Sequence, residues 1–237
     1  MNWNRAELKA RAKGDLSGNY WYAFLVSLVI AITGGSHHWG GGAGGSSAGG
    51  TGGPGGDEFS LWIGLLVLVG VTLAILFRVF IGFAVEVGGR RFFLQLPGGN
   101  NDLGQIGYGF RAERYRDIWV TMLLRGIYLV LWTLLLIIPG IIKMYAYRLV
   151  PYILADNPHI GPRRAIELSN RMTMGEKLDI FILDLSFIGW YLLGALAFGI
   201  GVLFVQPYYD STNAELYFEL RQQALNRGLT TAEELRL

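Results

Sequence analysis

Residues 59–77 read FSLWIGLLVLVGVTLAILF, a run of 19 residues without a charged side chain. About 20 apolar residues in an α-helix are enough to cross the hydrocarbon core of a bilayer. A second uncharged run covers residues 185–209 and is 25 residues long. Apolar residues in continuous blocks of this length, not alternating with polar ones, predict an all-α polytopic transmembrane helix bundle.

The composition of the whole chain agrees with a membrane location. Hydrophobic residues make up 52% of the 237 residues and charged residues only 16%, whereas soluble domains carry about 25% charged residues. These proportions exclude a soluble enzyme domain, a disordered chain and a nucleic-acid-binding module. The net charge of +2 is too small to indicate a polyanionic partner, and the absence of cysteine excludes a disulfide scaffold.

The first apolar block, residues 20–33, is short, because at 1.5 Å per residue it extends over about 21 Å. Four basic residues precede it, as in a signal peptide. The basic front is unusually long, however, and residues 31–33 (AIT) make a poor cleavage site. We therefore expect a retained membrane anchor.

Three further apolar regions follow, at residues 61–85, 118–155 and 178–209. The last two are each long enough for two crossings if the chain turns at Pro139-Gly140 and at residues 199–201 (GIG), since proline and glycine let a helix stop and reverse. The sequence is therefore compatible with either four or six crossings.

The lysine and arginine positions decide between these numbers, because short loops rich in these residues stay cytoplasmic. Residues 34–60 and both predicted turns contain none of the 20. Four crossings would place residues 143–177, with six basic residues, outside the cell. We expect six crossings in three hairpins, with both termini cytoplasmic. The weakest crossing is residues 141–155, only 15 residues long, for which a tilted or re-entrant segment is the alternative.

We treat residues 1–237 as a single membrane domain with polar segments at its ends. For residues 1–19 we predict a cytoplasmic amphipathic helix that lies on the anionic leaflet of the membrane. The alternative is that these residues are simply the solvated segment before the first membrane span. Residues 208–237 predict a cytoplasmic helical tail, because their apolar positions follow helical spacing.

Residues 34–60 predict an extracytoplasmic loop. Glycine accounts for 13 of the 23 residues from 34 to 56, and such a stretch has little to bury. His37 and His38 stand without further ligands, so we expect no metal site there.

Several charged residues fall inside apolar regions, where an isolated charge costs roughly 3 kcal/mol or more, and three of them are the main candidates for a polar site, with Arg78 and Lys143 weaker. Arg125 lies about 10 Å into its predicted span and Asp184 about 9 Å into its own, both counted from the cytoplasmic side. Either the two pair across neighbouring helices and line a polar site, or Arg125 extends to the headgroups while Asp184 lies in a wet vestibule. Arg148, near mid-depth, is the third candidate for this intramembrane polar site.

Arg90 and Arg91 follow two glycines at the end of the second span and are candidates for contact with anionic lipid headgroups. The end of a helix explains the two glycines equally well. No catalytic constellation is visible, because His159 has no Ser or Cys partner at a telling spacing, and the glycine-rich tract lacks the ending of a phosphate loop. We therefore expect no catalytic residue, metal or cofactor.

Five motifs occur in order along the second half of the chain: IPGII at 138–142, YILADNP at 152–158, LDLSFIGW at 183–190, GIG at 199–201 and PY at 207–208. Their ordered set resembles the domain-of-unknown-function 975 family of bacterial integral membrane proteins, over roughly residues 8–225. The glycine tract and residues 175–178 depart from the family pattern. The resemblance implies a polytopic protein of the bacterial cytoplasmic membrane, and it carries over no catalytic residues because the family has no established activity.

From these observations we expect a non-enzymatic, membrane-embedded binding or interaction protein. Its partners would be the lipid bilayer, with anionic headgroups or a membrane protein as specific contacts, and the sequence leaves the oligomeric state open. The alternative is a small transporter or channel that uses the region of Arg125, Arg148 and Asp184. A packed interior favours the first function, and a continuous polar cavity favours the second.

Overall fold

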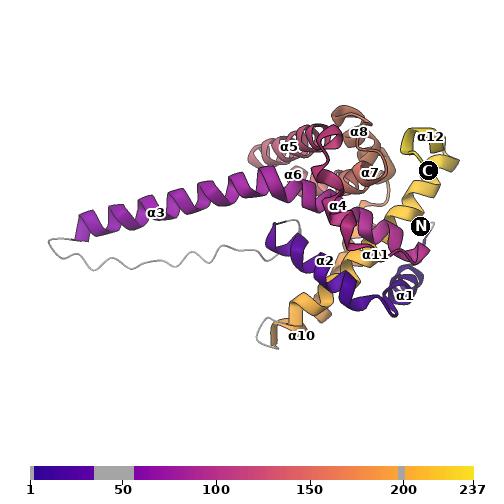
Figure 1. The fold of residues 1–237 in the computed structure, drawn as a ribbon. Helices are drawn as coiled ribbons and strands as arrows, with labels where there is room; N and C mark the ends of the chain where they lie inside the picture. The colour runs from indigo at the N-terminus through magenta and orange to yellow at the C-terminus, as the bar shows by residue number, and fades with distance from the viewer. Residues whose placement is uncertain (1–2, 35–55, 197–200) are drawn as a thin grey trace.

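The structure is a computed structural model that describes residues 3–34, 56–196 and 201–237, and over these residues the chain is all α-helical (Figure 1). The helices of the first half are α1 (Arg5–Leu16), α2 (Tyr20–Ile32), α3 (Gly56–Phe77), α4 (Phe83–Gln95) and α5 (Ala112–Leu135). Those of the second half are α6 (Ile137–Ala146), α7 (Val150–Asp156), α8 (Pro162–Met172), α9 (Lys177–Leu185), α10 (Ile188–Leu196), α11 (Gly201–Asn226) and α12 (Ala232–Leu235). A π-helical turn, η1 (Arg78–Gly82), joins α3 to α4, and 3-10 segments η2 (Leu96–Gly98) and η3 (Leu103–Phe110) precede α5.

Four helical stretches are long and apolar enough to cross a membrane: Trp62–Gly98, Ala112–Leu135, Ile137–Asp156 and Lys177–Leu196. A fifth is added if α1 and α2, which are bent by 106° relative to each other, form one broken span. The structure thus confirms an all-α chain with several candidate crossings. Among the described helices, α2 alone and α11 do not reach the required length and hydropathy, although we expected a crossing in each.

Helix α3 stands apart from the rest of the molecule in Figure 1, where it extends away from the other helices. Every residue from 62 to 77 is exposed, and nearly all of them are apolar. The predicted glycine-rich loop, with His37 and His38, lies largely outside the described residues, and α3 begins within its last part. An apolar helix exposed on all sides requires lipid or another apolar helix around it.

Helices α5 and α6 pack against each other as a hairpin, but the turn lies earlier than the predicted one at Pro139-Gly140. The reversal occurs at Leu136, whose φ of −158° and ψ of 138° are extended. Pro139 instead lies in the first turn of α6, where its missing N–H has no helical partner to lose. Gly140 permits the close approach of the two helices, since a Cβ there would lie 2.9 Å from Cα of Thr133.

The weakest predicted crossing, residues 141–155, is a broken helix. α6 ends at Ala146 and α7 begins at Val150, with Pro151 in its first turn. The two pieces together cover Ile137–Asp156, one of the four candidate spans, of which 50% of the apolar window is buried in the protein. This segment is therefore shielded from lipid far more than α3, whose window is 0% buried.

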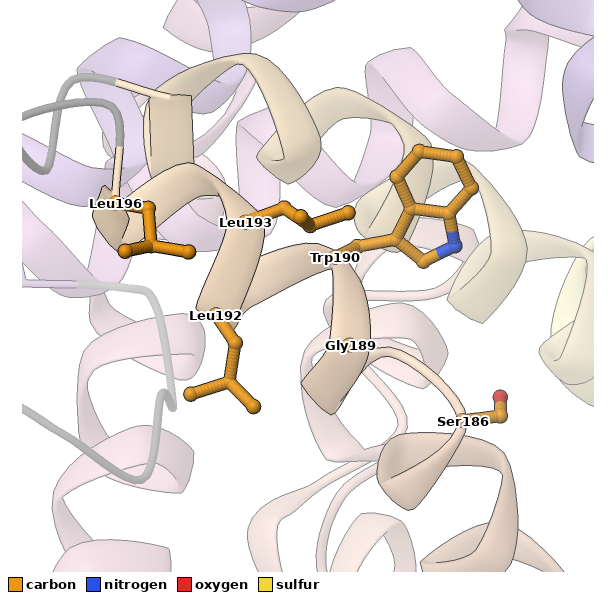
Figure 2. Close-up of a pocket in the computed structure, with 6 residues that line it drawn as sticks. All are labelled: Ser186, Gly189, Trp190, Leu192, Leu193 and Leu196. Carbon is orange, nitrogen blue, oxygen red and sulfur yellow. The ribbon is translucent and has the colours of Figure 1, made fainter.

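Helices α9 and α10 follow each other with a short break, and α10 presents apolar side chains outward. An open hollow of about 510 Å³ lies along α10 and the break before it. Figure 2 shows the residues that line it, which are Ser186, Gly189, Trp190, Leu192, Leu193 and Leu196. None of these side chains is charged. α10 returns closely to α11, since a Cβ on Gly194 would lie 2.7 Å from the amide nitrogen of Val202. Most of the predicted turn at residues 199–201 lies outside the described residues.

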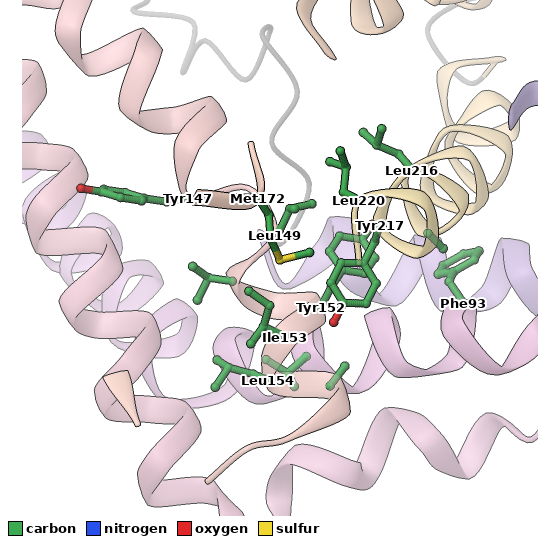
Figure 3. Close-up of a cluster of buried hydrophobic side chains, with 14 of the residues drawn as sticks. Phe93, Tyr147, Leu149, Tyr152, Ile153, Leu154, Met172, Leu216, Tyr217 and Leu220 are labelled. Carbon is green, nitrogen blue, oxygen red and sulfur yellow. The ribbon is translucent and has the colours of Figure 1, made fainter. Parts of the chain in front are cut away.

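The hydrophobic core lies where α4, α7, α8 and α11 meet (Figure 3). α7 is buried from Val150 to Ala155, and Ile153 and Leu154 are 0% exposed. The ring of Tyr152 stacks on that of Tyr217 of α11, with 5.4 Å between centroids. Burial of large side chains on all sides of a short helix fixes it in place even though the helix is too short to be stable alone.

The N-terminal helix packs on protein. Leu8 and Ala12 of α1 are 0% exposed, and α1 contacts α11. The expected amphipathic helix at residues 1–19 therefore turns its apolar side toward α11, because α11 continues well beyond the apolar region and offers an apolar surface there. The predicted helical tail is present as the second half of α11 followed by α12.

Candidate functional site

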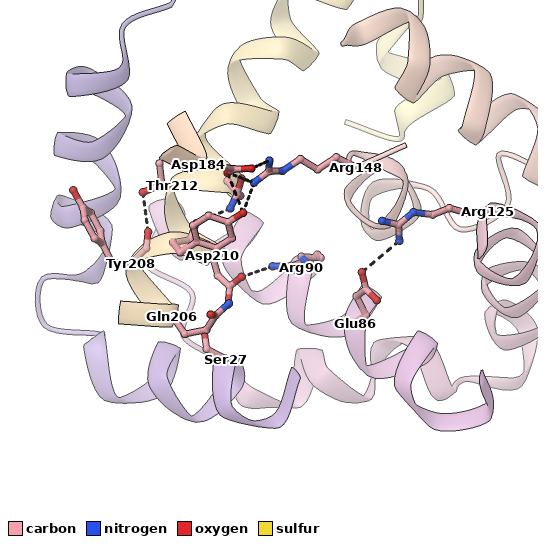
Figure 4. Close-up of polar contacts among 12 residues, drawn as sticks. Ser27, Glu86, Arg90, Arg125, Arg148, Asp184, Gln206, Tyr208, Asp210 and Thr212 are labelled. Atoms are coloured by element: carbon pink, nitrogen blue, oxygen red, sulfur yellow. Dashed lines mark hydrogen bonds and ion pairs between the residues drawn. The ribbon is translucent and has the colours of Figure 1, made fainter. Parts of the chain in front are cut away.

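The first part of the candidate site is a buried ion pair between α4 and α11. Arg90 Nη1 lies 2.6 Å from Asp210 Oδ1, and the two side chains are 8% and 0% exposed. The other oxygen of Asp210 accepts hydrogen bonds from Ser27 Oγ of α2 at 2.8 Å and from Gln206 Nε2 at 3.1 Å. One carboxylate thus joins three helices (Figure 4).

The second part is centred on Glu86 of α4, which is 0% exposed. Arg78 Nη2, from the π-helical turn, lies 2.6 Å from its Oε2, and Arg125 Nη1, from α5, lies 3.5 Å from its Oε1. Arg78 also donates to the carbonyl oxygen of Thr33 at the end of α2, at 3.2 Å. This carboxylate therefore holds the base of α3 and the middle of α5 together.

The third part joins the break between α6 and α7 to α9 and α11. Both terminal nitrogens of Arg148 donate to Asp184, Nη1 at 2.7 Å and Nη2 at 2.8 Å. Nη2 also donates to Tyr209 Oη and to Asn213 Oδ1, each at 2.6 Å. Asp184 accepts further bonds from the hydroxyls of Tyr145 and Tyr209. Bidentate pairs of this kind are strong and directional.

Helix α11 positions most of the site because its polar residues share one face. Gln206, Asp210, Asn213 and Tyr217 are spaced by three or four residues, which places side chains in a row along a helix. Tyr152 lies between the first and third parts, and the guanidinium carbon of Arg90 is 5.3 Å from its ring centroid. The Arg90–Asp210 and Arg148–Asp184 pairs thus both adjoin the polar face of α11.

The hypothesis that Arg125 pairs with Asp184 is wrong. Asp184 is bound by Arg148 and by two tyrosines, and Arg125 by Glu86. Arg125 is only 4% exposed, so it does not extend to the headgroups either. Counting residues along a span gives depth but no position around the bundle, and at this depth other partners lie closer.

The structure also contradicts a headgroup role for Arg90, which is 6% exposed and paired with Asp210. Arg91 donates to Gln105 Oε1 at 3.2 Å and to the carbonyl oxygen of Ala155, and it stacks over Tyr108. The prediction failed for Arg90 because the apolar run ends at residue 85, whereas the helix continues to Gln95 and is buried in the protein at Arg90.

Sequence reasoning missed Glu86 and Asp210, the two fully buried carboxylates. The signal was present, because both follow apolar stretches directly and both lie a few residues from an arginine or a glutamine on a helical face. No group of three or more His, Cys, Asp or Glu side chains in the described residues is placed to hold a metal ion. His159 instead contacts Asp117, with Nδ1 2.7 Å from Oδ2.

A protein-family model matches part of the chain. No curated protein and no solved structure matches the chain. The matched stretch, residues 133–224, includes Arg148, Asp184 and Asp210 but not Glu86 or Arg90. Over residues 133–224 the chain matches the family described as "Protein of unknown function (DUF975)", which confirms the resemblance seen in the sequence motifs.

Proposed function

We propose that this protein is a non-enzymatic membrane protein that binds lipid and a membrane partner. The observation that carries the proposal is α3, whose residues 62–77 are apolar and exposed all round. An apolar surface of that length is typical of a lipid or protein contact inside the bilayer.

The arrangement of the buried charges supports this function. The carboxylates of Glu86 and Asp210 are 0% exposed, and each has an arginine within 3.5 Å. Pairs that are fully desolvated and hydrogen-bonded hold helices in one arrangement, and their separation is costly. Such buried pairs suit a rigid scaffold better than a path along which a transported solute exchanges binding partners.

A photo-crosslinking residue tests the proposal. We place it at Leu66 of α3, with Leu134 at the end of α5 as a matched control, because the two side chains are 69% and 78% exposed. In native membranes we expect Leu66 to crosslink to one defined membrane protein in addition to lipid, and Leu134 to lipid alone. Identical lipid-only products from both positions would contradict partner binding.

A transporter or channel is the second candidate, favoured by the partial exposure of one ion pair. The side chains of Arg148 and Asp184 are 13% and 24% exposed, more than those of Arg90 and Asp210. Purified protein in liposomes is assayed for proton and potassium flux. We expect the flux of empty liposomes, and a flux that Asp184→Asn abolishes would favour transport.

We also propose that the chain crosses the bacterial cytoplasmic membrane six times, in three hairpins with both termini inside. The absence of basic residues from residues 34–60 and from the α5–α6 turn supports this arrangement, as does the close return of α10 on α11. Crossings through α2 and the start of α11 require these short segments to be completed by local thinning of the bilayer or by shielding within the bundle.

A further inference from the structure

The segment from Phe110 to Arg116 lies where the exposed apolar surfaces of α3 and α5 both stop. Tyr115 Oη donates to the carbonyl oxygen of Phe80 at 2.6 Å, and Phe80 belongs to the π-helical turn directly after α3. Phe80 also stacks on Trp119 of α5, with 6.0 Å between ring centroids. The base of α3 and the first turns of α5 are therefore side by side.

Aromatic side chains are exposed at this level. Phe80 is 49% exposed, and Phe110, which stacks on Tyr115, is 45% exposed. One turn after Arg116, Val120 of α5 is 37% exposed and is the first residue of the exposed apolar side of that helix. Aromatic residues at the boundary of an apolar surface are typical of the membrane interface.

Three arginines lie within the same segment. Arg111 and Arg116 are exposed, and in the described part of the chain neither has an ion-pair partner. Arg114 stacks on Tyr108, its guanidinium carbon 4.4 Å from the ring centroid, and Arg91 stacks on the same ring at 4.1 Å. The segment thus presents fixed cations beside exposed aromatic rings.

The neighbouring carboxylates do not neutralise this surface. Asp117 contacts Nδ1 of His159 at 2.7 Å. Glu113 lies in the first turn of α5, where the helix dipole favours a negative charge. The three arginines outnumber these two acids, and among the residues that the structure describes no ion pair between either acid and Arg111 or Arg116 is present, so both arginines stay available at the surface.

We propose that residues 110–116 are a docking surface for the anionic phospholipid headgroups of the leaflet in which α3 ends and α5 begins. The planar guanidinium of arginine binds a phosphate through two parallel hydrogen bonds, which suits Arg111 and Arg116 to this ligand. Phe110 and Phe80 enter the adjoining acyl region. The inference rests on the lipid contact in the proposed function and assigns it to these residues, in place of Arg90 and Arg91.

The test measures lipid bound to the full-length protein in detergent by native mass spectrometry. The probes are phosphatidylglycerol and phosphatidylcholine with the same acyl chains. We compare Arg111→Gln/Arg116→Gln with Arg227→Gln/Arg236→Gln, which removes the same charge from exposed positions near the C-terminus. We expect the wild type to prefer phosphatidylglycerol by roughly tenfold, the first variant to lose this preference and the control to keep it.

Two further measurements complete the test. Arg111→Lys/Arg116→Lys keeps the charge but loses the planar guanidinium, so we expect an intermediate preference for phosphatidylglycerol. Size-exclusion chromatography checks that all variants stay folded. Glycerol 3-phosphate should not compete with the lipid. The proposal is overturned if the folded glutamine variant keeps the wild-type preference or if glycerol 3-phosphate displaces the lipid. The readout does not involve the α3 partner or solute flux, so it fails independently of the proposed function.

Discussion

Asp210 is the residue on which the packing of α2, α4 and α11 depends most directly. It accepts hydrogen bonds from Arg90, Ser27 and Gln206 and is 0% exposed. Removal of one member of a buried pair leaves the other charge without compensation in a medium of low dielectric. The Arg90 side chain is only 8% exposed, so water can compensate its charge only in part.

Asp210→Ala should therefore destabilise the protein by about 3–5 kcal/mol. Its thermal unfolding midpoint in detergent, followed by loss of the monodisperse peak, should fall far below that of the wild type. Glu113→Gln, at an exposed position, is the control and should leave the midpoint unchanged. A midpoint for Asp210→Ala equal to that of the control would contradict a structural role for this pair.

Arg148→Lys tests whether the third ion pair depends on the shape of the guanidinium. The arginine makes two bonds to Asp184 and one each to Tyr209 and Asn213, and a lysine ammonium cannot reproduce this fork. We expect a loss of about 1–3 kcal/mol in stability although the charge is kept. The measurement is the unfolding midpoint, and a lysine variant as stable as the wild type would mean that charge alone is sufficient.

At the scale of single elements, the docking of α1 on α11 contains a group that titrates near neutrality. Burial, and then the adjacent carboxyl of Asp15, raise the pKa of Glu215 from its ordinary value of 4.5 to about 7, while Arg11 acts in the opposite direction. Arg11 Nε lies 3.0 Å from Glu215 Oε2, and Arg11 Nη2 lies 3.2 Å from Glu219 Oε2. The folded state thus binds a proton that the unfolded chain releases at lower pH.

A raised pKa of an acid means that its contribution to stability is fully present below the unfolded value and is lost as pH rises through the folded value. Stability should therefore decline from pH 4.5 toward about pH 7. In Glu215→Gln this part of the decline should disappear, as measured by unfolding midpoints from about pH 5 to about pH 8. Identical pH profiles for the variant and the wild type would show that Glu215 does not titrate in this range.

The contact between α4 and η3 depends on a glycine. A Cβ on Gly88 would lie within 2.7 Å of the carbonyl oxygen of Gln105, and backbone atoms cannot move aside cheaply. Gly88→Ala should cost about 1–3 kcal/mol, whereas Gly126→Ala, where no atom lies within 4 Å of the added Cβ, should be neutral or stabilising. Equal unfolding midpoints for the two variants would mean that η3 yields easily.

The existence of most elements could be predicted from hydropathy, and their partners could not. The block at residues 20–33 corresponds to α2, Tyr20–Ile32, because an uninterrupted apolar run is itself the signal. The turn of the α5–α6 hairpin was placed three residues late, since Pro139 is tolerated in a first helical turn as well as in a loop. The ion pairs were missed because Arg90 and Asp210 are 120 residues apart, and only the packing of helices brings them together.

At the scale of the whole molecule, the proposed six crossings give a direct topological prediction. The chain has no cysteine, so single cysteines report position without background. Arg163→Cys should react with a membrane-impermeant thiol reagent only after cells are permeabilised, because the proposed six crossings place this basic region in the cytoplasm. Ser47→Cys should react in intact cells. Labelling of Arg163→Cys in intact cells would exclude the six-crossing arrangement.

The order of synthesis gives the Arg90–Asp210 pair a consequence for biogenesis. A ribosome that has just added Arg90 has 120 residues still to add before Asp210 exists. During that interval the carboxylate that joins α2, α4 and α11 is missing, so the assembly of these helices has to wait for the last long helix to arrive. Chains that end before Asp210 should therefore leave α2 and α4 without the α11 contact that holds them together in the full-length protein.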